Sequence, residues 1–184
     1  MLTKPNNIRL AACRPYICID PILWLPMTTK ERSRVVRWRI GFLPGKPVPC
    51  WCHRDGALTT TSHLIECFHL HAILEVPDTA TIDPISFVLN KLPKKPPKEQ
   101  RHQQYWNRIW PQLCEALYKI DFNCHPNEVF TNSKDPDPGR LFLNWIKSVG
   151  DPPPFSLTST IAPATTDTTD TTSTAPVVPH HEVN

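Results

Sequence analysis

The chain has 184 residues, a length that suits one domain of ordinary size with a tail, and a formal net charge of +3. Its 22 prolines, well above the usual share of ~5%, favour short elements joined by extended segments, whereas five glycines argue against a collagen-like fold or a phosphate-cradling loop. No run approaches the roughly 18 consecutive apolar residues of a membrane-spanning helix, so we expect no membrane partner.

The first 27 residues are expected to be irregular, and a helix is predicted after them, over residues 29–42. Thr28 and Glu31 have the spacing of a capping box at its start, and Gly41 marks its end. Arginines are interleaved with the apolar positions of this helix: Arg32, Arg34, Arg37 and Arg39. Such a pattern indicates either a surface for a polyanion or the ordinary solvated face of a helix.

Prolines and capping residues define the next elements. Residues 43–49 should be extended, because three prolines restrict both themselves and the residues before them. A second helix is predicted over 62–74, with Ser62 as its N-cap. A third is predicted over 84–92, with Asp83 as its N-cap and a proline at its first position.

The remaining part of the chain alternates linker and helix. Residues 93–98 read PKKPPK, which indicates a basic polyproline II linker and also matches weak SH3-ligand and nuclear-localisation patterns. A helical zone follows over 99–118, which we expect Pro111 to kink or split, and a last helix over 137–149. From residue 151 the Thr- and Pro-rich sequence lacks the apolar area to offset its chain entropy, which predicts disorder.

Seven cysteines and the absence of a clean signal peptide indicate a reducing, intracellular compartment, where clustered cysteines are metal ligands before they are disulfides. The informative window is Cys50-x-Cys52-x10-His63-x3-Cys67. In an extended segment the first two side chains point the same way, and at i and i+4 the last two share one face of a helix. Structural zinc takes four thiolate or imidazole donors in a tetrahedron, so this pattern predicts one structural zinc site.

Other interpretations of the same residues stay open. Cys52 and Cys67 are ordinary buried thiols if no metal binds, and a neighbouring histidine could replace a proposed ligand: His53, His69 or His71. A second metal site is conceivable at three further cysteines, although separate structural thiols are the simpler interpretation: Cys13, Cys18 and Cys124.

A catalytic zinc site is a further alternative. His63, Glu66 and Cys67 come one residue short of the inverted zinc-protease motif H-x-x-E-H. A catalytic zinc needs an open coordination position, however, which Cys50 and Cys52 would close. We therefore expect a structural ion and no enzyme activity.

The charge is unevenly distributed. Residues 1–150 hold all 20 Lys and Arg and 13 of the 17 acidic residues, about +7, which indicates either a polyanionic partner or an ordinary solvated basic surface. We expect no small-molecule substrate. Trp51 lies between two proposed ligands, where it either stacks on an unpaired base or packs on its own loop. The candidate nucleic-acid-binding residues are Arg32, Arg34, Arg37, Arg39, Lys46, Trp51 and Arg54.

The run RSRVVRWRIGFLPGKPVPCWCHRDGALTTTSHLIEC resembles the C-terminal region of non-LTR retrotransposon reverse transcriptases of fungal type. In that family an arginine-rich helix precedes a zinc motif of Cys-x-Cys or Cys-x2-Cys, a short loop with Thr, then His and Cys. The segments DPILWLP and DPISFVLNKLP are also similar to fungal members, so the resemblance covers roughly residues 10–93, with a weaker likeness up to about residue 149. Many members space the His and Cys one residue further apart than this chain does.

The resemblance implies a role in binding template RNA or target DNA, while catalysis takes place in another part of a full-length protein. We expect the contacts to be mainly with the nucleic-acid backbone. It places the zinc ligands at Cys50, Cys52, His63 and Cys67. The polymerase palm with its Tyr/Phe-x-Asp-Asp turn is missing, as are an endonuclease and a ribonuclease H set of carboxylates, so we expect a non-catalytic piece. The alternative is a structural or protein-interaction remnant with no nucleic-acid affinity.

We therefore predict a mainly α protein: a small helical domain with a zinc-binding loop, long Pro-rich linkers and a disordered C-terminal tail. Its expected segments are an irregular start, 1–27, an arginine-rich helix with the zinc-binding module, 28–92, and the basic linker, 93–98. A helical segment, 99–150, and the tail, 151–184, complete the chain.

Overall fold

The computed structural model describes residues 14, 17–52, 54–127 and 134–148, and over these the chain is mainly helical, as predicted. The tail expected at 151–184 and most of the N-terminal segment lie outside the described residues. None of the described helices combines the length and the apolar character needed to cross a bilayer. In chain order the elements are η1 (Pro21–Leu23), α2 (Thr29–Arg39), α3 (Thr61–Cys67), α4 (Leu70–Ile73), α5 (Pro84–Asn90), α6 (Gln100–Cys124) and α8 (Arg140–Lys147).

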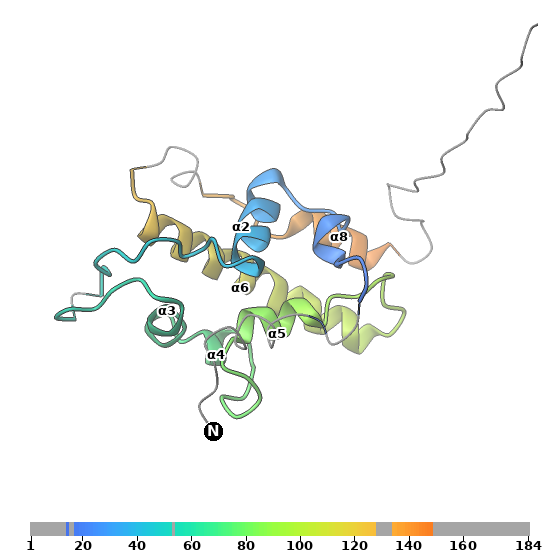
Figure 1. The fold of residues 1–184 in the computed structure, drawn as a ribbon. Coiled ribbons are helices and arrows are strands. Elements are labelled where there is room, and N and C mark those ends of the chain that lie inside the picture. Colours follow the sequence, from blue (N-terminus) through green and yellow to red (C-terminus); the bar gives the residue numbers. More distant parts are fainter. Residues whose placement is uncertain (1–13, 15–16, 53, 128–133, 149–184) are drawn as a thin grey trace, which may run out of the picture.

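Helix α6 is the axis of the molecule. Its 25 residues extend about 37 Å at 1.5 Å per residue. In Figure 1, α2 and α8 lie above α6, whereas α3, α4 and α5 lie below it. Three of these helices contact α6 directly: α2, α4 and α8. One face of α6 packs into the core. Its fully buried side chains recur at helical spacing: Ile109, Trp110, Leu113, Leu117 and Ile120.

Helix α6 is longer than predicted and is not split. It continues through Pro111 and ends at Cys124, six residues beyond the expected end at 118. A proline in a helix costs about 3 kcal/mol, which the burial of the apolar side chains on both sides of it outweighs. The six additional residues include the buried Asp121, which contacts α2, and the buried Asn123, which contacts the loop before α3.

The helix predicted over 62–74 is broken into α3 and α4. His69 takes the left-handed backbone conformation, with φ of +51°, and ends the regular hydrogen bonding between the two pieces. Leu64 before the break and Leu70 after it are both fully buried. The N-cap of α3 is Thr60 rather than Ser62, and its hydroxyl accepts from the His63 backbone N–H.

The predicted caps of α2 and α5 are confirmed. At the start of α2 the Thr28 hydroxyl accepts from the Glu31 N–H, and the Glu31 carboxylate accepts from the Thr28 N–H at 2.8 Å. At the start of α5 the Asp83 carboxylate accepts from the Ser86 N–H. Glu31 also accepts from the backbone N–H of Gly139, which precedes α8, so one buried carboxylate joins the starts of two helices.

Candidate metal centre

The segment between α2 and α3 folds back on itself as a narrow loop. The Thr59 N–H donates to the Val48 carbonyl at 2.8 Å, and the Cys50 N–H donates to the Ala57 carbonyl at 2.9 Å. Gly56, with φ of +69°, allows the reversal between these two bonds at little cost. The loop therefore returns the chain to the start of α3 close to the two cysteines.

The two loop cysteines are joined by a turn rather than by the extended segment that the preceding prolines predict. Trp51 and Cys52 form this turn, and the Cys52 backbone N–H donates to the Cys50 sulfur. An extended pair would present both side chains to one side without this bond. The turn satisfies a backbone donor and holds both thiols near one point.

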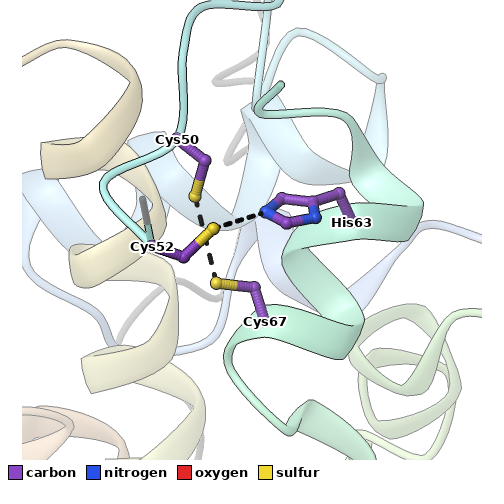
Figure 2. Close-up of side chains that lie close together, drawn as sticks. All are labelled: Cys50, Cys52, His63 and Cys67. Atoms are coloured by element: carbon purple, nitrogen blue, oxygen red, sulfur yellow. Dashed lines mark hydrogen bonds between the residues drawn. The ribbon is translucent and has the colours of Figure 1, made fainter. Parts of the chain in front are cut away.

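Four side chains converge at the loop, as Figure 2 shows: two from the turn and two from one face of α3. Their donor atoms all lie within 4.8 Å of one another. The Cys50 and Cys67 sulfurs are 3.9 Å apart, and the Cys52 sulfur is 3.4 Å from the His63 Nε2. The predicted set Cys50, Cys52, His63 and Cys67 is therefore brought together.

These distances match the edges of a metal-centred tetrahedron. Bonds of about 2.3 Å to sulfur and about 2.0 Å to nitrogen give edges of about 3.8 Å between two sulfurs and about 3.5 Å between sulfur and nitrogen. The two measured edges, 3.9 Å and 3.4 Å, differ from these values by about 0.1 Å. The four residues could therefore bind one metal ion.

The thiols of the centre have unlike acidities. Burial opposes ionisation of Cys50, but hydrogen bonds from the Cys52 backbone N–H, the Asn123 amide and His63 outweigh it and lower its pKa to about 6. Burial raises the pKa of Cys67 to about 11, and the neighbouring Cys50 and Cys52 thiols add to this rise. A cation among the donors would favour both thiolates, because it replaces the repulsion between them with attraction.

Asn123 attaches the centre to α6. Its side-chain amide nitrogen lies 3.4 Å from the Cys50 sulfur, and its Oδ1 accepts from the Trp51 N–H at 3.4 Å. Sequence reasoning missed this residue, because it placed the end of the helix before it. The signal was the apolar spacing of Ile120 and Cys124, which continues the buried face of α6.

The alternative histidine ligands lie elsewhere or are not described. His71 Nδ1 is 3.2 Å from the Val76 carbonyl oxygen and 3.2 Å from the Asp78 carboxylate. His69 is exposed at the break between α3 and α4, and His53 lies outside the described residues. Among the described residues, neither His69 nor His71 belongs to the donor group.

The other cysteines do not extend the centre. The described cysteines are all free thiols. Burial raises the pKa of Cys124 to about 11, as expected of a structural thiol. Cys13 lies outside the described residues, and within the described part Cys18 and Cys124 join no group of metal-ligating side chains.

Two arginines of α2 point into the fold. Arg34 is only 3% exposed, and its Nε lies 3.1 Å from the Asp121 carboxylate. Arg37 Nη2 lies 2.6 Å from the same oxygen, and His125 Nδ1 lies 3.2 Å from the other one. The guanidinium of Arg34 is therefore too buried to contact a polyanion. The guanidinium of Arg37 is partly exposed, but its charge is already paired with Asp121.

The other two arginines of α2 tie the helix to the segment before it. Arg32 donates to the backbone carbonyls of Ile22 and Leu25, which fixes η1 against α2. Arg39 Nε lies 3.1 Å from the Asp20 carboxylate. Both side chains thus stabilise the fold through intramolecular partners.

The three candidate residues outside α2 are exposed. Lys46 and Arg54 lie in the loop with their side chains in solvent, and Trp51 is 50% exposed. Trp51 meets Phe122 edge-on, with ring centroids 5.0 Å apart and an interplanar angle of 86°. A cavity of about 340 Å³ lies beside the centre, with Phe68 and Tyr118 also in its lining.

Comparison of the chain with protein-family models, with curated proteins and with solved structures finds no match.

The arrangement of the donors itself limits the chemistry of the site. Four protein ligands complete a tetrahedron and leave no position for the water or substrate that a catalytic metal binds. Glu66, the candidate base of the protease-like interpretation, is exposed on α3 and is not one of the four donors.

Proposed function

We propose that the four donors hold one structural zinc ion and that the module so formed binds nucleic acid as the C-terminal portion of a retroelement reverse transcriptase, without polymerase activity of its own. The observation that carries the metal assignment is the pair of edges at 3.9 Å and 3.4 Å. Zinc is the preferred ion, because three thiolates and one imidazole are the soft and borderline donors of its closed tetrahedral sites.

The zinc ion would supply stability that the loop lacks. Of the described residues between 45 and 60, only Cys50 and Thr59 are buried, so little apolar area holds this segment. A bound ion would join the turn to α3 directly and to α6 through Asn123. Because the donors are brought together only in the folded chain, the free energy of metal binding would contribute to folding.

The nucleic-acid part of the proposal is supported by charge and by one aromatic side chain. Residues 1–150 carry about +7, and Lys46, Arg54 and the half-exposed Trp51 all belong to the loop that the metal would fix. Lysine and arginine would contact phosphates, and the indole would stack on an unpaired base. The resemblance to the reverse-transcriptase region points to the same partner.

A second candidate function is favoured by the internal pairing of α2. Because Arg34 and Arg37 share the buried Asp121, the helix expected to carry the polyanion surface has much of its charge neutralised. The module would then be a structural or protein-interaction element with no nucleic-acid affinity. Binding measurements at low salt separate the two functions.

The metal is tested first. Purified protein should contain one zinc ion per chain, and cobalt substitution should give the intense absorption of tetrahedral cobalt–thiolate coordination. Cys52→Ser should lose the ion, whereas Cys124→Ser removes a buried thiol outside the donor group and should keep it. Equal metal content in the Cys52→Ser variant and the parent protein would exclude the proposed ligand set.

Nucleic-acid binding is tested by fluorescence anisotropy with single-stranded RNA and duplex DNA over a range of salt concentrations. Trp51→Ala should weaken single-strand binding about 5- to 150-fold, the effect of losing one stacked base. Phe42→Ala is the matched control, because it removes an aromatic side chain that is 68% exposed and precedes residues 45–60, the part of the loop that carries the two cysteines and is called the metal loop. Parent protein that binds neither nucleic acid at low salt would establish the second candidate instead.

A further inference from the structure

Exposed positive charge gathers on residues 91–102, which connect α5 to the first turn of α6 and are called the basic segment below. It contains five cations and one acid, Glu99, and so has a formal charge of +4 with histidine neutral. Glu99 lies 3.5 Å from His102. All five cations are exposed: Lys91, Lys94, Lys95, Lys98 and Arg101.

Three cations of the basic segment, Lys95, Lys98 and Arg101, are available to a partner. Within the described part of the chain, no carboxylate forms an ion pair with Lys95, Lys98 or Arg101. Lys91 Nζ lies over the Phe87 ring, 4.0 Å from its centroid, an arrangement that leaves the charge uncompensated. The segment is therefore a source of positive potential rather than a part of an internal network.

A cleft opens against the basic segment. Its volume is about 510 Å³, within the range of roughly 300–1,000 Å³ typical of small-ligand sites. Lys91 from the end of α5 and Arg101 from the first turn of α6 both line it. Tyr105 and Trp106 also line it, with ring centroids 5.1 Å apart at an interplanar angle of 80°. Cations from two elements thus flank an aromatic surface.

The basic segment is held in place. The Gln103 side chain donates to the Pro97 carbonyl at 2.8 Å, which ties the segment to α6. Three of residues 93–98 are prolines, and these restrict the backbone between the lysines. Such pre-organisation lowers the entropy lost when a partner binds.

We propose that the basic segment and its cleft bind single-stranded nucleic acid, with the lysines and Arg101 on successive phosphates and one unpaired base stacked on Tyr105. The inference rests on the proposed function and gives it a second surface. A single strand is the partner that fits, because a duplex offers phosphates but keeps its bases paired, whereas the aromatic lining suits an exposed base.

The two surfaces lie at opposite ends of α6. The basic segment leads into the first turn at Arg101, while Asn123 in the last turn holds the metal loop. These positions are 22 residues apart, or about 33 Å at 1.5 Å per residue. At about 3.4 Å per stacked nucleotide, a strand of roughly ten nucleotides would reach both.

The phosphate contacts are tested with two matched triple variants. K95Q/K98Q/R101Q removes three cations of the basic segment, and K134Q/R140Q/K147Q removes three exposed cations near or on α8. The first should reduce the salt slope of single-strand binding by about 2 and the affinity about 100-fold at 0.1 M salt. The second should change the affinity less than about threefold, because it changes only the overall field.

The cleft is tested with Tyr105→Leu, which removes the ring and keeps apolar bulk, and with Tyr105→Phe, which keeps the ring. Tyr105→Leu should weaken single-strand binding about 5- to 150-fold and leave duplex binding unchanged. Tyr105→Phe should bind single strands as tightly as the parent protein does. Thermal unfolding of each variant checks that the fold is intact.

The outcomes separate the two proposals. If the parent protein binds nucleic acid and the two triple variants bind equally well, the surface proposed here is wrong and the proposed function stands. Equal affinity of the parent protein for single strands and for polyglutamate would likewise overturn the choice of partner. If the parent protein binds no nucleic acid at low salt, the proposed function fails and this inference with it.

Discussion

Helix α2 and the basic segment have the same charge in the sequence and opposite placements in the fold. Each contains five cations and one acid, within 11 and 12 residues respectively. In α2, however, the arginines are paired with Asp121, Asp20 and backbone carbonyls. The cations of the basic segment are exposed. The number of charges in a stretch therefore does not identify the surface that attracts a polyanion.

The difference follows from backbone geometry and side-chain chemistry. At i and i+3 on a helix, Arg34 and Arg37 lie on the face that α6 covers, and the planar guanidinium offers several donors to one carboxylate. The Pro-rich stretch of the basic segment forms no helix with a buried face, and lysine keeps its strongly hydrated ammonium in water. Four experiments, in order of expected effect, test whether the two regions differ in this way.

The largest effect is expected at the carboxylate that neutralises α2. Asp121→Asn leaves the buried Arg34 guanidinium without its counter-charge, so the free energy of unfolding should fall by about 3–5 kcal/mol. Urea denaturation measures this change. Glu115→Gln on the same helix is the control, because its ion pairs to Lys119 and Lys134 are at the surface and contribute at most ~1 kcal/mol. Equal losses in both variants would contradict an internal role for the α2 charges.

The candidate metal centre resembles α2 in one respect: its donors are buried or half-buried, and its thiolates would need a cation as partner. With its pKa raised to about 11, Cys67 is protonated throughout pH 6–8, and metal binding must release that proton. Each released proton lowers the apparent affinity about tenfold per pH unit, so zinc should bind at least about 100-fold more weakly at pH 6 than at pH 8.

Below pH 6 the loss should become steeper, since Cys50, with its pKa lowered to about 6, adds a further proton to be displaced. Competition with a chromophoric chelator, carried out from pH 8 to below pH 6, measures how zinc affinity changes with pH. An affinity that does not depend on pH would show that the thiols are not the ligands.

A smaller effect is expected for the half-buried cation of α2. Arg37→Gln removes a charge-assisted hydrogen bond of 2.6 Å to Asp121, and its partial exposure limits the cost to about 1–2 kcal/mol of unfolding free energy. The salt slope of nucleic-acid binding should not change. A reduced salt slope in this variant would show that Arg37 of α2 does contact the nucleic acid.

The smallest effect on stability is expected in the basic segment. Lys98→Gln should change the unfolding free energy by less than ~0.5 kcal/mol, because the side chain is exposed and makes no ion pair among the described residues. In contrast to Arg37→Gln, it should reduce the salt slope of single-strand binding by about 0.7. A marked loss of stability without a change in slope would reverse the roles assigned to the two regions.

Several features could be predicted from short stretches of sequence. The capping box of Thr28 and Glu31, and Asp83 before a proline, predict the starts of α2 and α5 correctly, because capping involves residues only three positions apart. The i and i+4 spacing of His63 and Cys67 likewise brings both side chains to one face of α3.

Features that depend on distant partners could not be predicted in this way. The end of α6 lies beyond its expected position because tertiary packing outweighs the local cost of Pro111. Asn123 contacts the metal loop across 73 residues of sequence, and no local pattern marks it as a partner of Cys50. The break at His69 also depends on packing, since Leu64 and Leu70 are both buried across it.

Local sequence was enough to predict the helical character, two helix starts and the four metal-ligating candidates, because these depend on chemistry within a few residues. Contacts between distant segments fix which positive charges are neutralised and which reach solvent. Arg34 finds its carboxylate 87 positions away in α6, whereas Lys95, Lys98 and Arg101 of the basic segment form no ion pair among the described residues. Charge is a local property of the chain, but its compensation depends on long-range packing.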